Sequence, residues 1–111
     1  MAKGTRVERP TKRAEYTLVF ATREARVGWD ALCATQRNIM ADAWDLLTKQ
    51  PQQKTPTTHP LRGELGVVMR AGAAHERWQH ELSGGARIWY FVVDHEVHLE
   101  QVHTHHPNAT K

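Results

Sequence analysis

Residues 86–93, with the sequence ARIWYFVV, constrain the fold most because nearly every side chain in this segment is apolar. A strand with one solvated face alternates polar and apolar residues, whereas a central strand of a covered sheet is apolar on both faces. Residues 77–82 precede this segment across a Ser-Gly-Gly sequence at 83–85, and glycines adopt the positive φ angles of tight hairpin turns. The pattern therefore predicts a β-hairpin over residues 77–93, with its second strand at the centre of a sheet.

A further strand is predicted over residues 97–103, after a turn at residues 94–96. Val97 and Leu99 share one face of this strand, but Val102 falls on the opposite face. An extra residue in a strand reverses the alternation of its side chains. We therefore expect a bulge, or the end of the strand, near Val102.

The N-terminal part of the chain predicts one strand and two helices. Residues 15–20 alternate polar and apolar side chains, as in a half-buried strand. Apolar residues then recur at helical spacing in two stripes, and Thr22 and Thr35 stand where the two helices would be capped. The stripes are Ala25, Trp29, Leu32 and Cys33, followed by Ile39, Met40, Ala43, Trp44 and Leu47. Gly28, inside the first stripe, would allow a neighbour to approach closely. Helices this close in sequence predict an αα-hairpin.

The rest of the chain completes the predicted order of elements. Residues 50–60 contain three prolines and are predicted to form a loop. Residues 61–70 include one short strand at most, and residues 71–76 form a connection. The order β-α-α-β-β-β predicts an α+β fold of two layers, in which an N-terminal strand and a helical hairpin pack on a twisted antiparallel sheet. The other face of the sheet is left for a partner or a substrate.

The 111 residues fit a single domain, and their charge is unevenly distributed. Residues 1–13 hold five basic side chains and one acidic side chain, a net charge of +4, whereas residues 14–111 hold ten basic and eleven acidic side chains, or −1. We expect a flexible basic arm over residues 1–13, a folded domain over 14–107 and a tail over 108–111. Because the folded domain is not strongly basic, its charge alone argues only weakly for nucleic-acid binding.

The single cysteine, Cys33, excludes an intrachain disulfide, and a lone thiol is typical of a reducing cytosol. The sequence has no run of about 18 apolar residues, and its basic N-terminus lacks the apolar segment of a secretory signal. We therefore expect a cytoplasmic protein without a membrane-spanning segment.

Five of the eight histidines lie within twelve residues near the C-terminus: His95, His98, His103, His105 and His106. On an extended strand His103 and His105 point to one side and His106 to the other. A zinc site needs three or four nitrogen or sulfur ligands, and the chain has neither a cysteine pair nor an HExxH helix. No metal or other cofactor is therefore predicted. The histidines form a polar strand end, a group for proton transfer or phosphate contact or, as the least favoured alternative, a metal site.

Other candidate side chains lie on the loop and on the hairpin. His59 follows the predicted loop in the sequence HPLRGELG, where a histidine is either functional or merely solvated. Arg62 and Arg87 are cations near strand edges. Trp89 shares a face with Arg87 and, if exposed, is the tryptophan best placed to stack on a base. Tyr90 faces away from Arg87 unless a bulge intervenes.

The order of elements and three sequence features together resemble the RelE/ParE toxin superfamily over residues 14–107. These features are HPLRGELG, RWQHELSGGARIWYFVVD and a last strand that ends in histidines. The resemblance implies the toxin of a type II toxin–antitoxin system, with a cognate antitoxin protein as its partner. It implies that a RelE-like member cleaves mRNA on the ribosome without a metal ion, whereas a ParE-like member inhibits DNA gyrase.

Within the RelE-like branch the motifs are nearest to the YoeB type. His59 stands where that type has an acid before Pro-Leu-Lys, and Arg62 stands at the lysine. Residues 87–90 match the family's Arg-Leu-Val-Tyr, residues 103–106 match its terminal His-Tyr, and a family arginine falls at about His80. The resemblance implies catalytic roles for His59, Arg62, Arg87, Tyr90, His103, His105 and His106, and RNA contacts by Arg62, His80, Arg87 and Trp89.

Three functions fit these observations. The first is a ribosome-dependent mRNA endonuclease in which histidines transfer protons, arginines stabilise phosphate charge and a tyrosine positions the phosphate. The second is a non-enzymatic inhibitor that binds gyrase or another host protein. The third is a metal-binding protein. The near-neutral domain favours the second function over a typical ribonuclease, whereas the histidine-rich end favours the first or the third.

Overall fold

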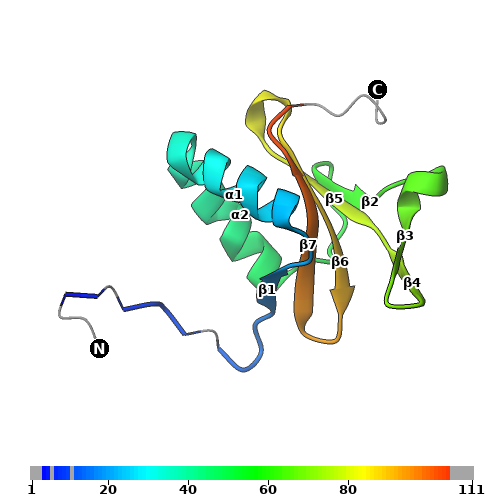
Figure 1. The fold of residues 1–111 in the computed structure, drawn as a ribbon, viewed down its shortest axis with the longest axis horizontal. Coiled ribbons are helices and arrows are strands. Elements are labelled where there is room, and N and C mark those ends of the chain that lie inside the picture. The colour runs from blue at the N-terminus through cyan, green and yellow to red at the C-terminus, as the bar shows by residue number, and fades with distance from the viewer. Residues whose placement is uncertain (1–3, 6, 11, 106–111) are drawn as a thin grey trace.

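The computed structural model describes residues 4–5, 7–10 and 12–105, and Figure 1 shows their fold. The elements are β1 (Thr17–Phe20), α1 (Arg23–Thr35), α2 (Arg37–Lys49), β2 (Thr58–Pro60), β3 (Val67–Arg70), β4 (Ala73–Glu76), β5 (Trp78–Glu81), β6 (Arg87–Val93) and β7 (Glu96–His103). Short 3-10 turns lie at Gly63–Gly66 and Ser83–Gly85. The predicted α+β class is confirmed, with the two helices packed on one face of the sheet (Figure 1). The predicted tail, residues 108–111, lies outside the described residues.

The sheet has the strand order β1-β7-β6-β5-β2, and most of its pairings are antiparallel. The exception is β1, which pairs in parallel with β7, so the prediction of a wholly antiparallel sheet is wrong at this edge. Local sequence patterns fix which face of a strand is buried, but they do not fix the direction of a partner from the other end of the chain. The predicted hairpin is confirmed as β5 and β6, and β6 lies between β5 and β7 as a central strand.

Residues 50–76 contain more structure than predicted. Thr58–Pro60 forms the edge strand β2 rather than loop, and a proline is tolerated there because an edge strand has unpaired backbone positions. Residues 73–76 form β4, a strand of a separate hairpin with β3, rather than a connection. Its turn places Ala71 and Gly72 at φ angles of 52° and 80°, the positive values that two-residue hairpin turns need. Alanine at such a position gives no turn signal in the sequence.

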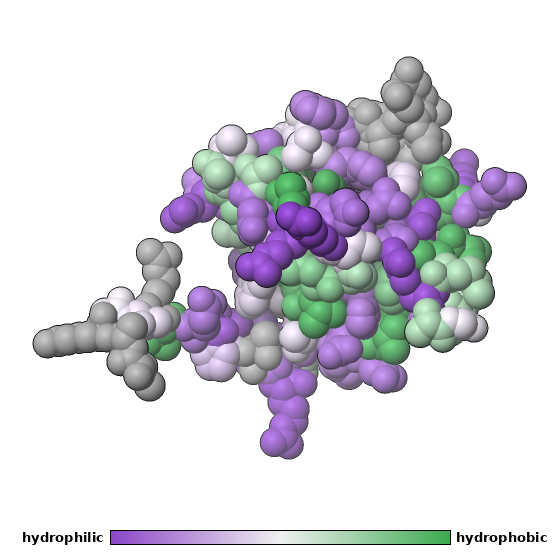
Figure 2. Space-filling model, viewed as in Figure 1, coloured by the Kyte–Doolittle hydropathy of each residue, from purple (hydrophilic) through white to green (hydrophobic). Residues whose placement is uncertain are grey.

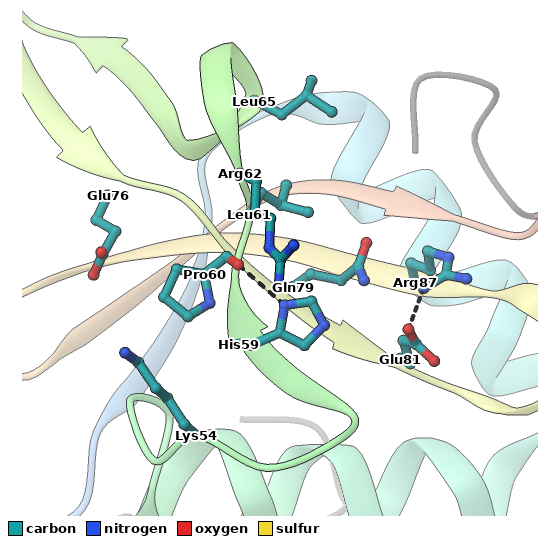
Figure 3. A pocket seen from close by; sticks show the side chains of 10 residues that line it. All are labelled: Lys54, His59, Pro60, Leu61, Arg62, Leu65, Glu76, Gln79, Glu81 and Arg87. Atoms are coloured by element: carbon teal, nitrogen blue, oxygen red, sulfur yellow. Dashed lines mark hydrogen bonds and ion pairs between the residues drawn. The ribbon is translucent and has the colours of Figure 1, made fainter. Parts of the chain in front are cut away.

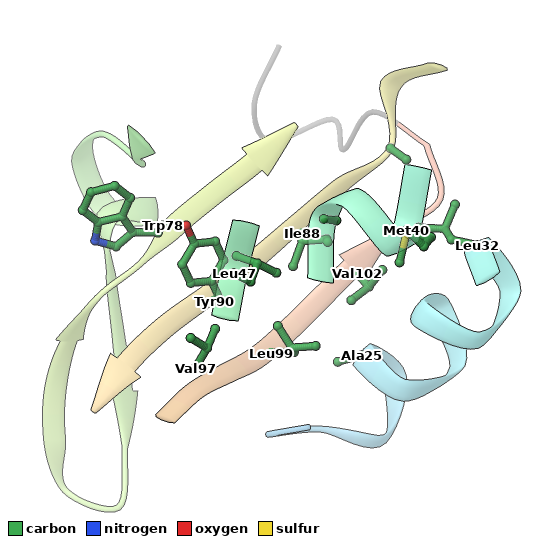
Figure 4. Close-up of a cluster of buried hydrophobic side chains, with 12 residues drawn as sticks. Ala25, Leu32, Met40, Leu47, Trp78, Ile88, Tyr90, Val97, Leu99 and Val102 are labelled. Atoms are coloured by element: carbon green, nitrogen blue, oxygen red, sulfur yellow. The ribbon is translucent and has the colours of Figure 1, made fainter. Parts of the chain in front are cut away.

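The buried core lies between the helices and one face of β5, β6 and β7 (Figure 4). A bulge shifts the register so that Trp89 pairs with Gln101 while Tyr90 pairs with Leu99. The extra residue lets Leu99 and Val102 both face the helices, as the broken alternation predicted. The largest buried side chains of this core include Met40, Leu47, Ile88, Tyr90, Val97 and Leu99.

The helical hairpin is confirmed, with only Gln36 between α1 and α2. Thr22 caps α1 as predicted, because its Oγ1 accepts a hydrogen bond of 3.0 Å from the backbone N–H of Ala25. Thr35 does not cap α2, since the chain stays helical up to Thr35 and Gln36 takes the capping position. None of the helices in the described part of the chain is long and apolar enough to cross a membrane.

Candidate functional site

The main candidate site is an open groove of about 900 Å³ on the sheet face that points away from the helices (Figure 3). Strand β2, the loop before it and the 3-10 turn after it form one side, while β4, β5 and β6 supply the other residues. The lining residues that carry charge or a titratable ring are Lys54, His59, Arg62, Glu76, Glu81 and Arg87. The structure therefore brings together His59, Arg62 and Arg87, which the sequence had predicted as site residues.

The His59 ring is oriented by its own neighbour in the chain. Its Nδ1 lies 3.0 Å from the carbonyl oxygen of Pro60, and a carbonyl only accepts, so Nδ1 carries the hydrogen of this bond. Nε2 is then the ring nitrogen that can exchange a proton with a ligand in the groove. Figure 3 shows this nitrogen on the side of the ring away from Pro60. The register fixes the ring's place on the sheet, because His59 is the partner of Gln79 in the β2–β5 pairing.

Arg87 is a half-buried cation with a carboxylate partner. It faces Glu81 across the β5–β6 pairing, and its Nη1 lies 2.7 Å from Glu81 Oε1 (Figure 3). The Arg87 side chain is 12% exposed and that of Glu81 is 37% exposed. The guanidinium therefore lines the groove with its charge balanced by a carboxylate that remains accessible.

Trp89 lies beside the groove but is covered. It shares the Arg87 face of β6, as predicted, yet it is only 3% exposed. The guanidinium carbon of Arg77 lies 5.3 Å from the centre of its ring, and the His103 ring packs edge-on at 4.7 Å. Its Nε1 donates a hydrogen bond of 2.9 Å to Gln79 Oε1. Trp89 therefore supports the groove from the side, through Gln79, and its ring is covered rather than available to stack on a base.

A buried carboxylate at the bulge holds this support in place. Glu100 is 3% exposed, and its Oε1 lies 2.9 Å from Nε of Arg77. Its other oxygen accepts hydrogen bonds of 3.0 Å from Arg77 and 3.2 Å from Arg70. Because Arg70 is on β3 and Arg77 immediately precedes β5, Glu100 ties the separate hairpin to the main sheet. The backbone of Arg77 also accepts from Leu61 N–H, which fixes the segment after His59.

Two predicted site residues lie on the other face of the sheet. Tyr90 is fully buried against the helices, and its hydroxyl donates a hydrogen bond of 2.6 Å to the Pro51 carbonyl oxygen. Burial raises the pKa of the Tyr90 hydroxyl far above its usual range. His80 is also buried on that face, with Nδ1 2.8 Å from Thr58 Oγ1, and burial lowers the pKa of its ring. The sheet therefore separates Tyr90 and His80 from the groove.

The C-terminal histidines do not join His59. His103 lines a second, smaller cleft of about 360 Å³ with Arg70, Glu100 and other residues near the start of α1. Burial lowers the pKa of the His103 ring, and the nearby positive charges of Arg77 and Arg87 lower it further. His105 is exposed. His106 lies outside the described residues.

Sequence reasoning missed four polar lining residues, Lys54, Glu76, Gln79 and Glu81. Glu81 and Gln79 could have been predicted from the sequence. The Ser-Gly-Gly turn places Glu81 opposite Arg87, and Gln79, two residues earlier, lies on the same face of the strand. Lys54 and Glu76 could not, since their positions depend on how the 50–76 segment folds. Across residues 4–5, 7–10 and 12–105, no three His, Cys, Asp or Glu side chains gather in a way that could hold a metal ion. Comparisons with protein-family models, with curated proteins and with solved structures find no match to this chain.

Proposed function

We propose that this protein is a metal-free, ribosome-dependent mRNA endonuclease, the toxin of a type II toxin–antitoxin pair, and that the groove beside β2 is its active site. The observation that carries the proposal is that His59, Arg62 and Arg87 line one groove. These are the side-chain types that RNA cleavage without a metal requires, a proton-transfer group and cations for phosphate charge. The resemblance of residues 14–107 to RelE-like toxins supports the same activity.

In such a reaction the 2′-hydroxyl of RNA attacks the adjacent phosphorus and the 5′-oxygen of the next nucleotide leaves. Negative charge accumulates on the non-bridging oxygens in the transition state. Arg62 and Arg87 supply guanidinium donors that match the geometry of these oxygens. Nε2 of His59 exchanges a proton with one of the two bridging oxygens. The groove is open, so a strand of mRNA displayed by the ribosome reaches these side chains without a change in the fold.

The proposal includes two macromolecular partners besides mRNA. The ribosome presents the strand, which lets a protein with a near-neutral domain work without strong RNA affinity of its own. A cognate antitoxin keeps the toxin inactive and folds in part on contact, as segments of this kind do. The antitoxin is expected to be a small acidic protein whose gene lies next to the gene for this chain.

A second candidate function is inhibition of a host protein such as gyrase without catalysis. The observation in its favour is an apolar surface on the β3–β4 hairpin, where Val67 is 52% and Met69 is 62% exposed. In Figure 1 this hairpin stands beside the main sheet, on the side away from the helices, and in Figure 2 hydrophobic residues gather over it. Exposed apolar side chains on a projecting hairpin suit a contact with another protein.

Induction of the chain in a bacterium separates the two functions. Growth arrest with loss of translated mRNA and intact DNA supports the endonuclease, whereas arrest with DNA damage and intact mRNA supports gyrase inhibition. The variants His59→Ala and Arg62→Ala should relieve the arrest if the groove is the active site. His95→Ala, which removes an exposed ring at the β6–β7 turn, is the matched control and should remain toxic. Absence of arrest by the wild-type chain would contradict both functions.

A further inference from the structure

RNA cleavage needs a proton acceptor and a proton donor, and the strand register prevents His59 and His103 from serving as that pair. His59 lies on β2 and His103 on β7, with β5 and β6 between them. Neighbouring strands are about 4.8 Å apart, so the two main chains are separated by about 14 Å across the sheet. The two oxygens that exchange protons flank a single phosphorus atom. The partner of His59 must therefore lie in the same groove.

Glu81 has the required position. Gln79 is the register partner of His59, and Glu81 follows two residues later on the same face of β5. Diagonal neighbours of this kind are about 7–8 Å apart, which leaves room for a phosphodiester between their side chains. The other carboxylate of the groove, Glu76, lies on β4 and accepts a hydrogen bond of 2.9 Å from Trp78 Nε1. Glu81 is therefore the carboxylate of the groove that lies diagonally across from His59 on the same face of the sheet.

The contacts of the two side chains assign their roles. Glu81 is held by Arg87 at 2.7 Å, and an ion-paired carboxylate can only accept a proton. Its side chain is 37% exposed, so a substrate hydroxyl can reach it. His59 donates from Nδ1 to Pro60, so its Nε2 is the nitrogen that faces the groove, and it is the second proton-transfer group that the reaction needs. Glu81 is therefore suited to take a proton, and His59 to give one from Nε2.

We infer that Glu81 is a catalytic residue of this groove, the general base for the 2′-hydroxyl, with His59 as the general acid for the leaving 5′-oxygen. The inference rests on the proposed RNA cleavage. The 2′-oxygen loses its proton to the Glu81 carboxylate and bonds to phosphorus, while the bond from phosphorus to the 5′-oxygen breaks. That oxygen takes the Nε2 proton of the His59 imidazolium. The products are a 2′,3′-cyclic phosphate and a 5′-hydroxyl, and exchange with water returns both side chains to their starting states.

The ion pair gives Arg87 a second role in this step. In the free protein the Arg87 guanidinium is engaged by Glu81. When Glu81 takes the proton it loses its charge, and Arg87 is released to the non-bridging oxygens as they become more negative. The cation thus strengthens its contact with the phosphate in the transition state, which is where stabilisation accelerates the reaction.

Other charged and titratable groups surround the pair. Charged or titratable side chains that line the depressions on either side of Glu81 come from several elements: Lys54, His59, Arg62, Glu76, Arg87, His80 and Asp42. Because Arg87 contacts Glu81 directly, replacement of Glu81 changes the environment of Arg87 as well. The test therefore needs a measurement that separates proton transfer from the placement of Arg87.

The experiment measures single-turnover cleavage of a defined mRNA on programmed ribosomes at about pH 7. Glu81→Gln should slow cleavage by about 10²–10⁴-fold, and His59→Ala should slow it by a similar factor. Glu81→Asp, which keeps a carboxylate, should recover part of the rate that Glu81→Gln loses. Glu81→Gln should also slow cleavage further in an Arg87→Ala chain, because its loss does not act through Arg87 alone. Glu96→Gln, at an exposed position at the start of β7, is the control and should match wild type.

A substrate with a bridging sulfur in place of the 5′-oxygen separates the two roles, because a thiolate leaves without a proton donor. It should restore the rate of His59→Ala to within about tenfold of wild type and leave Glu81→Gln slow. Restoration of Glu81→Gln instead would overturn the assignment. If Glu81 only anchored Arg87, Glu81→Gln would cause no further loss of rate in an Arg87→Ala chain, and that result would also overturn it. Failure of the wild-type chain to cleave at all would refute the proposed function itself.

Discussion

Gly28 of α1 lies directly against the main chain of Val102 in β7, and a Cβ atom at position 28 would collide with the Val102 carbonyl oxygen. The sequence showed a glycine inside a helical stripe, and the structure gives its reason, a close approach between the helix and the bulged strand. Replacement by alanine would gain about 1 kcal/mol of helix propensity. It would also force α1 away from β7. The atom in the way is the Val102 carbonyl oxygen, a backbone atom that cannot be moved by rotating a side chain.

Gly28→Ala should therefore lower the free energy of unfolding by a net amount of about 2 kcal/mol, because overpacking against a backbone atom costs about 3 kcal/mol and helix propensity offsets about 1 kcal/mol of it. Urea denaturation measures the change. Val27→Ala, one residue away on the exposed side of α1, is the control and should have little effect. A Gly28→Ala variant as stable as wild type would show that α1 and β7 are not packed this closely.

Glu100→Ala should lower the free energy of unfolding by about 3–5 kcal/mol, since it leaves the guanidinium of Arg77 buried without its partner. The same variant should loosen the β3–β4 hairpin, because Arg70 loses its contact with β7. Denaturation measures the first effect and amide hydrogen exchange in residues 67–76 measures the second. Glu96→Ala, at an exposed position of the same strand, should change stability by less than about 1 kcal/mol. Equal effects of the two variants would contradict the proposed support of the groove.

Tyr90→Phe should lower stability by about 1–3 kcal/mol, because the Pro51 carbonyl oxygen loses the hydrogen bond from the buried hydroxyl. It should leave the rate of RNA cleavage unchanged, since the sheet separates Tyr90 from the groove. Both quantities are measured on the same purified variant. A loss of cleavage without a loss of stability would restore the catalytic role that the family resemblance implied for Tyr90.

Stability should fall as the pH is lowered from about 7.5 to about 5.5. Burial lowers the pKa of His80 and of His103, so in this range the unfolded chain binds more protons than the folded one. Each histidine contributes at most about 1.4 kcal/mol per pH unit to this fall. His80→Gln should make the urea midpoint less dependent on pH, whereas the exposed His95→Gln should not. A midpoint that rises as the pH falls would show that the buried rings are protonated in the folded protein.

The sequence predicted those parts of the fold that are determined by local residue patterns. The β5–β6 hairpin followed from a glycine turn between apolar segments, and the bulge from the misplaced Val102. The parallel pairing of β1 with β7 and the short strand β2 were missed, because they depend on contacts between distant parts of the chain. The β3–β4 hairpin was missed because Ala71 gives no sign of a turn.

The same difference between local patterns and contacts of distant residues applies to the candidate site. His59, Arg62 and Arg87 were predicted from their residue types and motifs, and the structure places them in one groove. The sequence placed Trp89 on the correct face of its strand. It could not predict that Trp89 is buried, because the ring is covered by Arg77, which an ion pair with Glu100 on β7 holds in place. Glu81 was within reach of sequence reasoning, since the hairpin register alone sets it opposite Arg87.

The rate of mRNA cleavage by His59→Ala, compared with wild type on the same programmed ribosomes, tests the central claim most directly. We predict that wild type and His95→Ala cleave at the same rate and produce a 2′,3′-cyclic phosphate, while His59→Ala is slower by about 10²–10⁴-fold with an unchanged fold. Cleavage by His59→Ala at the wild-type rate, or no cleavage by wild type, would contradict the assignment of this groove as the active site of an endoribonuclease.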